Sequence, residues 1–199
     1  KKDAKIAVIG AMAGKLRYQG AGSSHINPVK TSQPLDFLPG AIYTPGCDDR
    51  GDTTDALLEE AAAAAGKAEI SIVFAGLPDR CESEGFDRSD MKMPAGHLRM
   101  IEAVVSANPN TVVVLLCGSA VECPWADEVK AVLYMGLPGQ AGGEAIAELL
   151  YGRVNPSGKL AESWPFTYED VPSSEIYGKT SDALYQEGVY VGYRYYDKA

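Results

Sequence analysis

The segment GLPDRCESEGFDRSDMKMP, residues 76–94, gathers side chains that could do acid–base chemistry. A carboxyl group acts as a general acid when burial or a neighbouring carboxylate raises its pKa enough to keep a proton near neutral pH, whereas a nearby arginine lowers that pKa. Gly85 permits a tight turn that could present the carboxyl before it. Composition alone favours a solvated charged loop. The charged residues of interest are Glu82, Glu84, Asp87, Arg80 and Arg88.

Two further polar segments also follow apolar runs. GAMAGKLRYQGAGSSHINP, residues 10–28, contains Ser23 and Ser24 among small residues, which could let backbone amides and hydroxyls approach a polar ligand. It lacks both the GxxxxGK[ST] pattern and the strict context of GxGxxG, so nucleotide binding is disfavoured. CGSAVECPW, residues 117–125, contains Ser119 without a GxSxG context or a nearby histidine, which argues against a Ser-His-Asp triad.

Strand and helix patterns alternate through most of the chain. Short, continuously apolar runs indicate buried strands, and longer amphipathic runs indicate helices. Alternation of this kind predicts an α/β fold, a three-layer sandwich whose mostly parallel sheet is covered on both faces. Thr53 or Thr54 can cap the first helix. The expected strands are 5–10, 41–47, 69–76, 111–118 and 129–139. Helices are expected within 53–68, within 93–110 up to a stop at 108–110, and within 141–160 between a Gly-rich turn and a polar exit loop.

These elements must position the polar segments. In an open parallel sheet, ligands usually meet the loops that follow the carboxyl ends of the strands. All three polar segments follow predicted strands, so we expect them at one edge of the sheet.

The pattern changes after Pro165, where the chain is rich in Tyr, Gly and Ser. We therefore divide the chain into a sandwich domain, residues 1–165, and an extended tail, residues 166–199. VYVGYRYYD, residues 189–197, has the pattern of a strand that packs on something else. The tail either covers this domain's own surface or is a linker into a further domain, and the pattern alone does not separate these alternatives.

Composition excludes several classes of function. The chain has 199 residues, of which 46% are hydrophobic and 23% charged, as in ordinary globular domains. Its formal net charge of −9 argues against nucleic acid or an anionic membrane as a partner. No apolar run approaches a membrane span. We expect no signal peptide in this chain, and the compartment stays open.

The cysteines and histidines do not predict a metal centre. None of the four cysteines forms a CxxC pair, and a zinc site needs clustered cysteines or histidines. We predict that Cys47 and Cys117 are free buried thiols and that His25 and His97 are surface or loop residues. We expect no metal and no organic cofactor.

Taken in order, several stretches resemble the second domain of glycoside hydrolase family 3, the β-glucosidase and β-xylosidase group. They extend over nearly the whole chain, and together they are far more specific than any one alone. The matching stretches are KIAVIG, YQGAGSSHINP, FAGLPDRCESEGFDRSDMKMP, NPNTVVVLLCGSAVECPW, GLPGQAGGEAIAELLYGRVNPSGKLAESWP and YQEGVYVGYRYYD.

The resemblance implies a six-stranded sandwich that carries the acid/base residue of a retaining β-glycosidase. The matching glutamate is Glu84, with Glu82 in reserve, and Ser23 or Ser24 matches a loop that approaches the sugar. The nucleophilic aspartate of such enzymes lies on a separate barrel domain, which does not occur in these residues. A fibronectin-like domain is expected to follow the tail.

The chemistry of a retaining glycosidase is consistent with placing the nucleophile and the acid/base residue on different domains. The mechanism needs two carboxyl groups roughly 5–5.5 Å apart, one ionised and one protonated. Two carboxylates on one loop could not readily flank a glycosidic bond, so the isolated chain should be inactive. The alternative is a non-catalytic module that binds a sugar or small ligand through residues 20–25. Sugar specificity, linkage and oligomeric state are left open.

Overall fold

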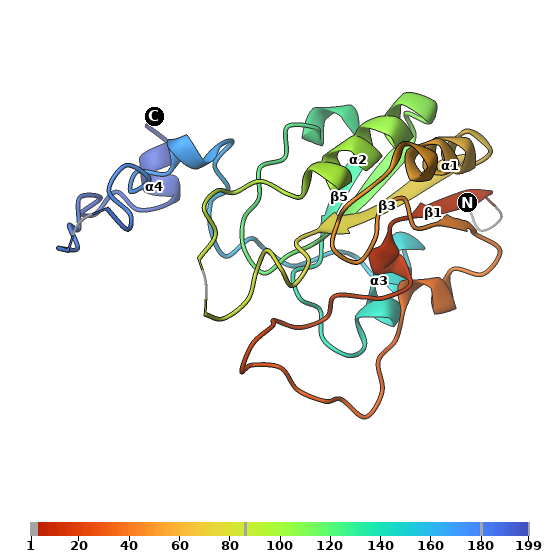
Figure 1. Ribbon diagram of the computed structural model, residues 1–199, viewed down its shortest axis with the longest axis horizontal. Coiled ribbons are helices and arrows are strands. Elements are labelled where there is room, and N and C mark those ends of the chain that lie inside the picture. The colour runs from red at the N-terminus through yellow and green to blue at the C-terminus, as the bar shows by residue number, and fades with distance from the viewer. Residues whose placement is uncertain (1–3, 86, 180, 199) are drawn as a thin grey trace.

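A parallel β-sheet forms the centre of the computed structural model, which describes residues 4–85, 87–179 and 181–198 (Figure 1). The strands lie in the order β2-β1-β3-β4-β5, and every neighbouring pair is parallel. The predicted α/β class is confirmed. The strands are β1 Ile6–Ile9, β2 Ile42–Thr44, β3 Ile70–Gly76, β4 Thr111–Leu116 and β5 Ala131–Tyr134.

The inner strands are buried on both faces, which explains their continuously apolar sequences. In β4, Val113 and Leu115 belong to one hydrophobic core cluster, whereas Val114 and Leu116 belong to the other. Successive side chains of a strand point to opposite faces, so a sheet covered on both sides requires apolar residues at every position.

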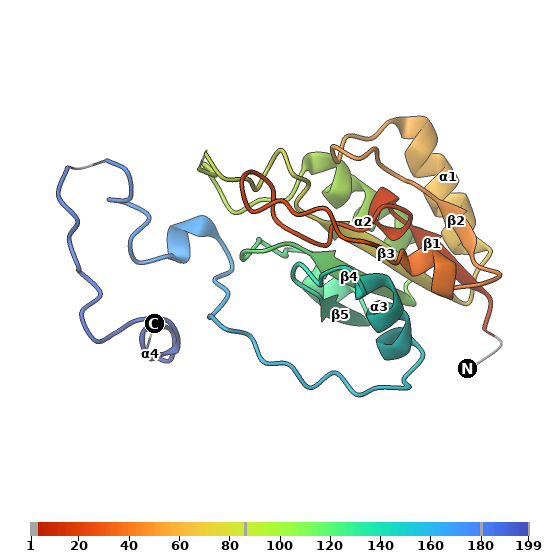
Figure 2. The same ribbon diagram turned by 90° about the horizontal axis from the view of Figure 1, so that it is seen from below.

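Helices α1 and α2 cover one face of the sheet, and α3 covers the other together with two 3₁₀ turns, η1 and η2 (Figures 1 and 2). The Thr54 side chain accepts a hydrogen bond of 3.3 Å from Leu57 N and so caps α1, one of the two caps predicted. The helical elements of the sandwich are α1 Asp55–Gly66, α2 Ala95–Ala107, α3 Gly142–Leu150, η1 Ala11–Ala13, η2 Pro34–Phe37 and η3 Ala126–Glu128.

The predicted number of strands is wrong by one. The sheet has five strands among the described residues, not six. The tail segment 189–197, which has the pattern of a strand, is not extended. Gly192 has φ 56° in the left-handed region, and helix α4, Tyr193–Tyr196, begins directly after it. A strand needs continuous extended backbone, and this glycine interrupts it.

The tail also differs from the predicted extended chain. It is built of turns with the short 3₁₀ helix η4, Tyr168–Asp170, and α4. Tyr168 N donates a 3.2 Å hydrogen bond to Glu122 Oε1, and beyond that contact the tail lies away from the helices of the sandwich (Figure 2). Several of its large apolar side chains are exposed, among them Phe166 and Tyr185.

The histidines and cysteines follow the sequence predictions except at one position. Cys47 and Cys117 are free and buried, and His25 is an exposed loop residue, as predicted. The prediction for His97 is wrong, because this side chain is buried in the first turn of α2. Its Nδ1 lies 3.0 Å from Gly76 O and 3.2 Å from Gly76 N, at the end of β3. His97 thereby ties α2 to the sheet.

Candidate active site

The three polar segments meet at the carboxyl edge of the sheet. The strand order changes direction between β1 and β3, since the chain passes from β1 to β2 on one side and then to β3 on the other. Open α/β sheets bind ligands in the crevice at such a switch point. The segments that follow β1 and β3, residues 10–33 and 77–94, flank this position (Figure 2).

Glu84 lies at the exposed tip of the second segment and is held by the first. Its Oε2 accepts hydrogen bonds from Ser23 N at 2.6 Å and from the Ser23 hydroxyl. Its backbone N donates to Ala21 O at 3.3 Å. The structure therefore brings together two predicted site residues, Glu84 and Ser23, that are 61 positions apart.

Gly22 allows this close approach. A Cβ at that position would lie 2.5 Å from the Glu84 Cβ, and its φ of +88° is one that other residues rarely adopt. Ser24, the other predicted binding residue, instead donates a long 3.5 Å hydrogen bond to Ala21 O. Among the described contacts, Glu84 is therefore bound by Ser23 and not by Ser24.

The Ser23 contacts favour the ionised form of Glu84. The hydrogen bond from the Ser23 hydroxyl, followed by that from Ser23 N, lowers the pKa of Glu84 below its ordinary value. Hydrogen bonds to a carboxylate stabilise its charge. A general acid must keep its proton, so a further element has to raise the pKa of Glu84 if this residue is to protonate a substrate.

Glu82, the reserve candidate, is bound by an arginine that the sequence analysis missed. Arg17 Nη1 donates to Glu82 Oε2 at 2.6 Å, and Arg17 Nη2 donates to Glu82 O at 2.9 Å. The same guanidinium also donates to Asp79 Oδ1 at 3.1 Å and to Leu77 O. The Arg17 side chain is only 5% exposed and that of Glu82 is 20% exposed, so this is a largely buried ion pair.

Glu82 also contacts the third polar segment. Gly118 N donates to Glu82 Oε2 at 2.9 Å, and the Ser119 hydroxyl donates to Glu82 Oε1 at 2.6 Å. Burial raises the pKa of Glu82, but the hydrogen bonds from Ser119, Gly118 and Arg17 outweigh it, and the net shift is downward. Arg88 continues the network, because its Nη1 donates to Ser119 Oγ at 2.9 Å.

The contacts of Glu82 therefore indicate a structural role, in which this residue links the three polar segments. Both of its carboxylate oxygens are occupied and its ionised form is stabilised, which suits neither a proton donor nor a group facing a substrate. Arg17 could have been suspected from the sequence, since it lies between apolar Leu16 and Tyr18 in a segment that follows a buried strand. Only the fold shows that Glu82 is its partner.

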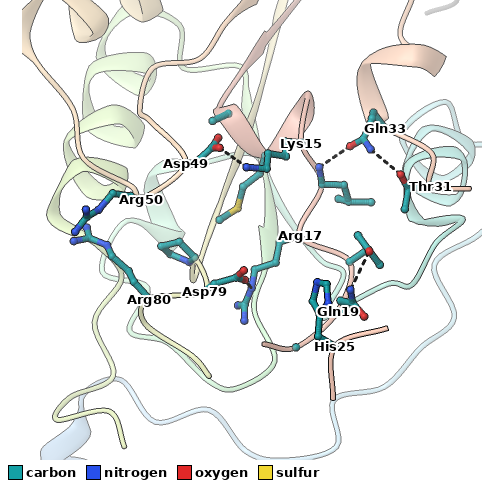
Figure 3. Close-up of a pocket in the computed structure, with 16 residues that line it drawn as sticks. Lys15, Arg17, Gln19, His25, Thr31, Gln33, Asp49, Arg50, Asp79 and Arg80 are labelled. Atoms are coloured by element: carbon teal, nitrogen blue, oxygen red, sulfur yellow. Dashed lines mark hydrogen bonds and ion pairs between the residues drawn. The ribbon is translucent and has the colours of Figure 1, made fainter. Parts of the chain in front are cut away.

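A cavity of about 520 Å³ lies beside the Arg17 network (Figure 3). Several of its charged side chains are already paired: Lys15 Nζ lies 2.5 Å from Asp49 Oδ2, and Arg17 contacts Asp79. Gln33 Oε1 accepts from Leu16 N at 2.6 Å. Several polar groups of the wall are thus paired with one another.

The part of the chain that the structure describes contains no cluster of three or more His, Cys, Asp or Glu side chains placed to hold a metal ion. In the same residues, every helix is too short or too polar to cross a bilayer.

Comparison with known proteins places the chain in a family. Residues 1–193 match the family model described as "Glycosyl hydrolase family 3 C-terminal domain". The thermostable beta-glucosidase B of Acetivibrio thermocellus is 48% identical over 99% of this chain. The exo-alpha-(1->6)-L-arabinopyranosidase of Bifidobacterium breve is 46% identical over 97% of it. The crystal structure of a GH3 beta-glucosidase from Bifidobacterium adolescentis superimposes with a TM-score of 0.91 and 44% identity over 99% of the chain.

The chain corresponds to only a part of these proteins. It spans 27% of the Acetivibrio protein, 26% of the Bifidobacterium breve protein and 30% of the crystallised chain.

Proposed function

Because the chain belongs to glycoside hydrolase family 3 and is a C-terminal domain of such enzymes, we propose that it supplies the general acid/base of a retaining glycosidase, with Glu84 as that residue. The observation that carries this proposal is the position of Glu84. It is exposed at the switch-point edge of the sheet and is held there by hydrogen bonds from the neighbouring segment. Both oxygens of Glu82, two residues away, are occupied by hydrogen bonds, so Glu84 is the available one of the two glutamates.

In the proposed mechanism, Glu84 acts twice. It first protonates the glycosidic oxygen as the bond to the sugar breaks and the nucleophile forms a covalent glycosyl-enzyme. It then takes a proton from the water that hydrolyses this intermediate. We propose that the nucleophilic aspartate lies on a barrel domain of a longer protein, so that the active site forms between two domains. The 199-residue chain alone is then inactive.

Docking of a second domain would also raise the pKa of Glu84. Ser23 lowers it in this chain. A second carboxylate roughly 5–5.5 Å away, together with exclusion of water from the closed site, raises the pKa of an acid. The acid form of Glu84 is therefore a property of the assembled enzyme.

The relatives suggest the class of substrate. One is named a beta-glucosidase and another an exo-alpha-(1->6)-L-arabinopyranosidase. The bond to the leaving group is equatorial in both β-D-glucopyranosides and α-L-arabinopyranosides, so one acid/base geometry serves either. We propose a terminal β-glucoside as the first substrate to test, with the arabinopyranoside second.

The proposal includes two partner domains in the same parent protein. A barrel domain would cover the edge that carries Glu84, and a fibronectin-like domain would follow the tail. We propose residues 1–165 as the sandwich domain and residues 166–199 as the linker. The exposed apolar side chains of the tail, such as Phe166 and Tyr185, suit a segment that packs against another domain.

The test is Glu84→Gln in a longer protein that joins this chain to a barrel domain. Loss of a general acid should lower kcat/KM on substrates with poor leaving groups by about 10²–10⁴-fold, with a much smaller effect on dinitrophenyl glycosides. Azide should restore turnover of the activated substrates by attacking the glycosyl-enzyme. The matched control is Glu60→Gln on the exposed surface of α1. Unchanged turnover of cellobiose by the Glu84 variant would remove Glu84 from this role.

The isolated chain provides the second test. The pure 199-residue protein should release no sugar from aryl β-glucosides, and robust hydrolysis would overturn the two-domain proposal. The non-catalytic alternative is tested in the same sample by calorimetric titration with glucose and cellobiose. Binding of a sugar through residues 20–25 with no activity in the longer protein would favour a binding module.

A further inference from the structure

We propose that Arg17 and Glu82 are positioning residues for Glu84. This inference rests on the proposed function, since it explains how the chain would hold the acid/base residue in place. Glu82 and Glu84 differ sharply in environment, although only Ser83 separates them. The first is a buried partner of an arginine, and the second is an exposed carboxylate at the tip of the same segment.

The contacts of residues 17–23 with residues 82–84 follow the same order along both segments. The Arg17–Glu82 ion pair comes first, at 2.6 Å. The hydrogen bond from Glu84 N to Ala21 O follows, at 3.3 Å. The contacts of Ser23 with the Glu84 carboxylate come last. Residues 17–23 and 82–84 thus run side by side, joined at successive points from the buried end to the exposed tip.

The buried end is the rigid one. Arg17 donates to side-chain and backbone oxygens of residues 77–82, which fixes the course of the chain as it leaves β3. Gly118 and Ser119 hold Glu82 from the third segment. A charged network that is largely excluded from water exchanges its partners less readily than an exposed one.

The position of Glu84 depends on the buried end of the segment. Two residues of extended chain span at most about 7 Å, so the position of Glu82 limits where the Glu84 backbone can lie. The exposed Ser23 contact alone competes with water and cannot replace that restraint. Displacing a catalytic group by about 1 Å can cost about 10²-fold in rate.

The network also explains why a glutamate serves at position 82. Its two oxygens accept from Arg17, Gly118 and Ser119, all of which donate. A glutamine of the same shape would place an amide NH₂ against one of those donors and would leave Asp79 as the carboxylate that pairs with Arg17. Glu82→Gln is therefore a small change in volume with a specific effect on the network.

The experiment is a double-mutant cycle of Glu82→Gln and Glu84→Gln in the longer protein. We measure kcat/KM on aryl glycosides whose leaving groups range from poor to dinitrophenyl. Glu82→Gln alone should cost about 10²-fold on the poorest leaving group and little on the best. In the Glu84→Gln background, the same change should cost little on any substrate, because a positioning residue has nothing left to position. Glu60→Gln is again the surface control.

The outcomes separate this inference from the proposed function. An equal loss from Glu82→Gln in both backgrounds, or no loss in either, would overturn the positioning role while Glu84→Gln still behaves as a lost acid. Unchanged leaving-group dependence in Glu84→Gln would overturn both proposals.

If Glu82→Gln does not fold, Ser119→Ala replaces it in the cycle. This variant keeps both charges and removes the hydroxyl that donates to Glu82 and accepts from Arg88. About a tenfold loss that disappears in the Glu84→Gln background supports the inference.

Discussion

The segment after β3 has a buried end and an exposed tip, and the same residue type behaves differently in each. Glu82 at the buried end is enclosed by Arg17, Gly118 and Ser119. Glu84 at the tip faces solvent and contacts the adjacent segment through Ser23 and Ala21. The pKa is lowered in both. Burial is the largest influence on the pKa of Glu82 and opposes the shift, whereas the hydrogen bonds from Ser23 are the largest influence on the pKa of Glu84.

The comparison distinguishes a carboxylate that is held by the fold from one that is available for chemistry. A carboxylate whose oxygens are filled by buried donors stabilises the fold and cannot easily exchange protons with a substrate. An exposed carboxylate contributes little to the fold and remains free to meet a partner domain. Changes at the buried end should therefore alter stability as well as the position of Glu84, whereas changes at the tip should alter titration and chemistry without altering stability.

The largest effect is expected from Arg17→Met in the 199-residue chain. The change leaves Glu82 partly buried without its cation, and breaking such a pair typically costs about 3–5 kcal/mol. Urea denaturation monitored by tryptophan fluorescence measures the loss in the free energy of unfolding. Arg50→Met is the matched control, since the Arg50 side chain is 72% exposed and lies on the same cavity. Equal losses in both variants would contradict a special role for the buried end.

A second prediction compares the two glutamates directly. Glu82→Gln should lower the free energy of unfolding at pH 7 by about 1.5–3 kcal/mol, because hydrogen bonds to a charged group are lost. Glu84→Gln should leave it unchanged within error. Since the folded pKa of Glu82 is lowered, its contribution is present above its ordinary pKa and disappears as the pH falls through the lowered value. The free energies of unfolding of the wild type and Glu82→Gln should thus converge at acid pH. Parallel curves would contradict a stabilising role of the ionised Glu82.

A third prediction concerns His97, which ties α2 to Gly76 just before the segment begins. Burial lowers the pKa of His97 to about 4, whereas a histidine in the unfolded chain titrates near 6.5. Between these values the unfolded state binds the proton and the folded state does not, so stability falls as the pH falls. We expect a loss of about 2 kcal/mol between pH 7 and pH 5.

The control for this loss is the other histidine. His97→Gln should flatten the pH dependence of the free energy of unfolding, and His25→Gln, at an exposed position, should leave it as in the wild type. An unchanged slope in His97→Gln would show that other groups cause the acid sensitivity.

The smallest effect is expected at the tip. Ser23→Ala removes the hydroxyl that contributes most to lowering the pKa of Glu84, so this pKa should rise toward its ordinary value. The stability of the chain should not change measurably. A carbon-detected NMR titration of the Glu84 carboxyl follows the shift, with Ser24→Ala as the neighbouring control. A larger shift in Ser24→Ala than in Ser23→Ala would contradict the observed pairing.

Much of the fold could be predicted from the sequence because burial on both faces leaves a strong local signal. The run TVVVLL can be satisfied only by a covered inner strand, and it forms β4. The failures have equally local causes. Gly192 is compatible with a strand in a pattern of alternating residues, but its left-handed backbone interrupts the expected strand in the tail. His97 is polar by type, and its burial depends on the packing of α2 against Gly76.

The sequence alone predicted which segments contain the candidate site residues, because residue type and position after a buried strand are local properties. Through the family resemblance it predicted Glu84 as the acid/base residue, with Glu82 in reserve, and Ser23 or Ser24 near the sugar, but it did not predict their contacts. Only the tertiary structure paired Glu82 with Arg17 and Glu84 with Ser23, across 65 and 61 positions. The physical reason is that solvent exposure and hydrogen-bond partners depend on which strands lie next to one another in the sheet. These two properties decide whether a carboxylate supports the fold or remains free to react.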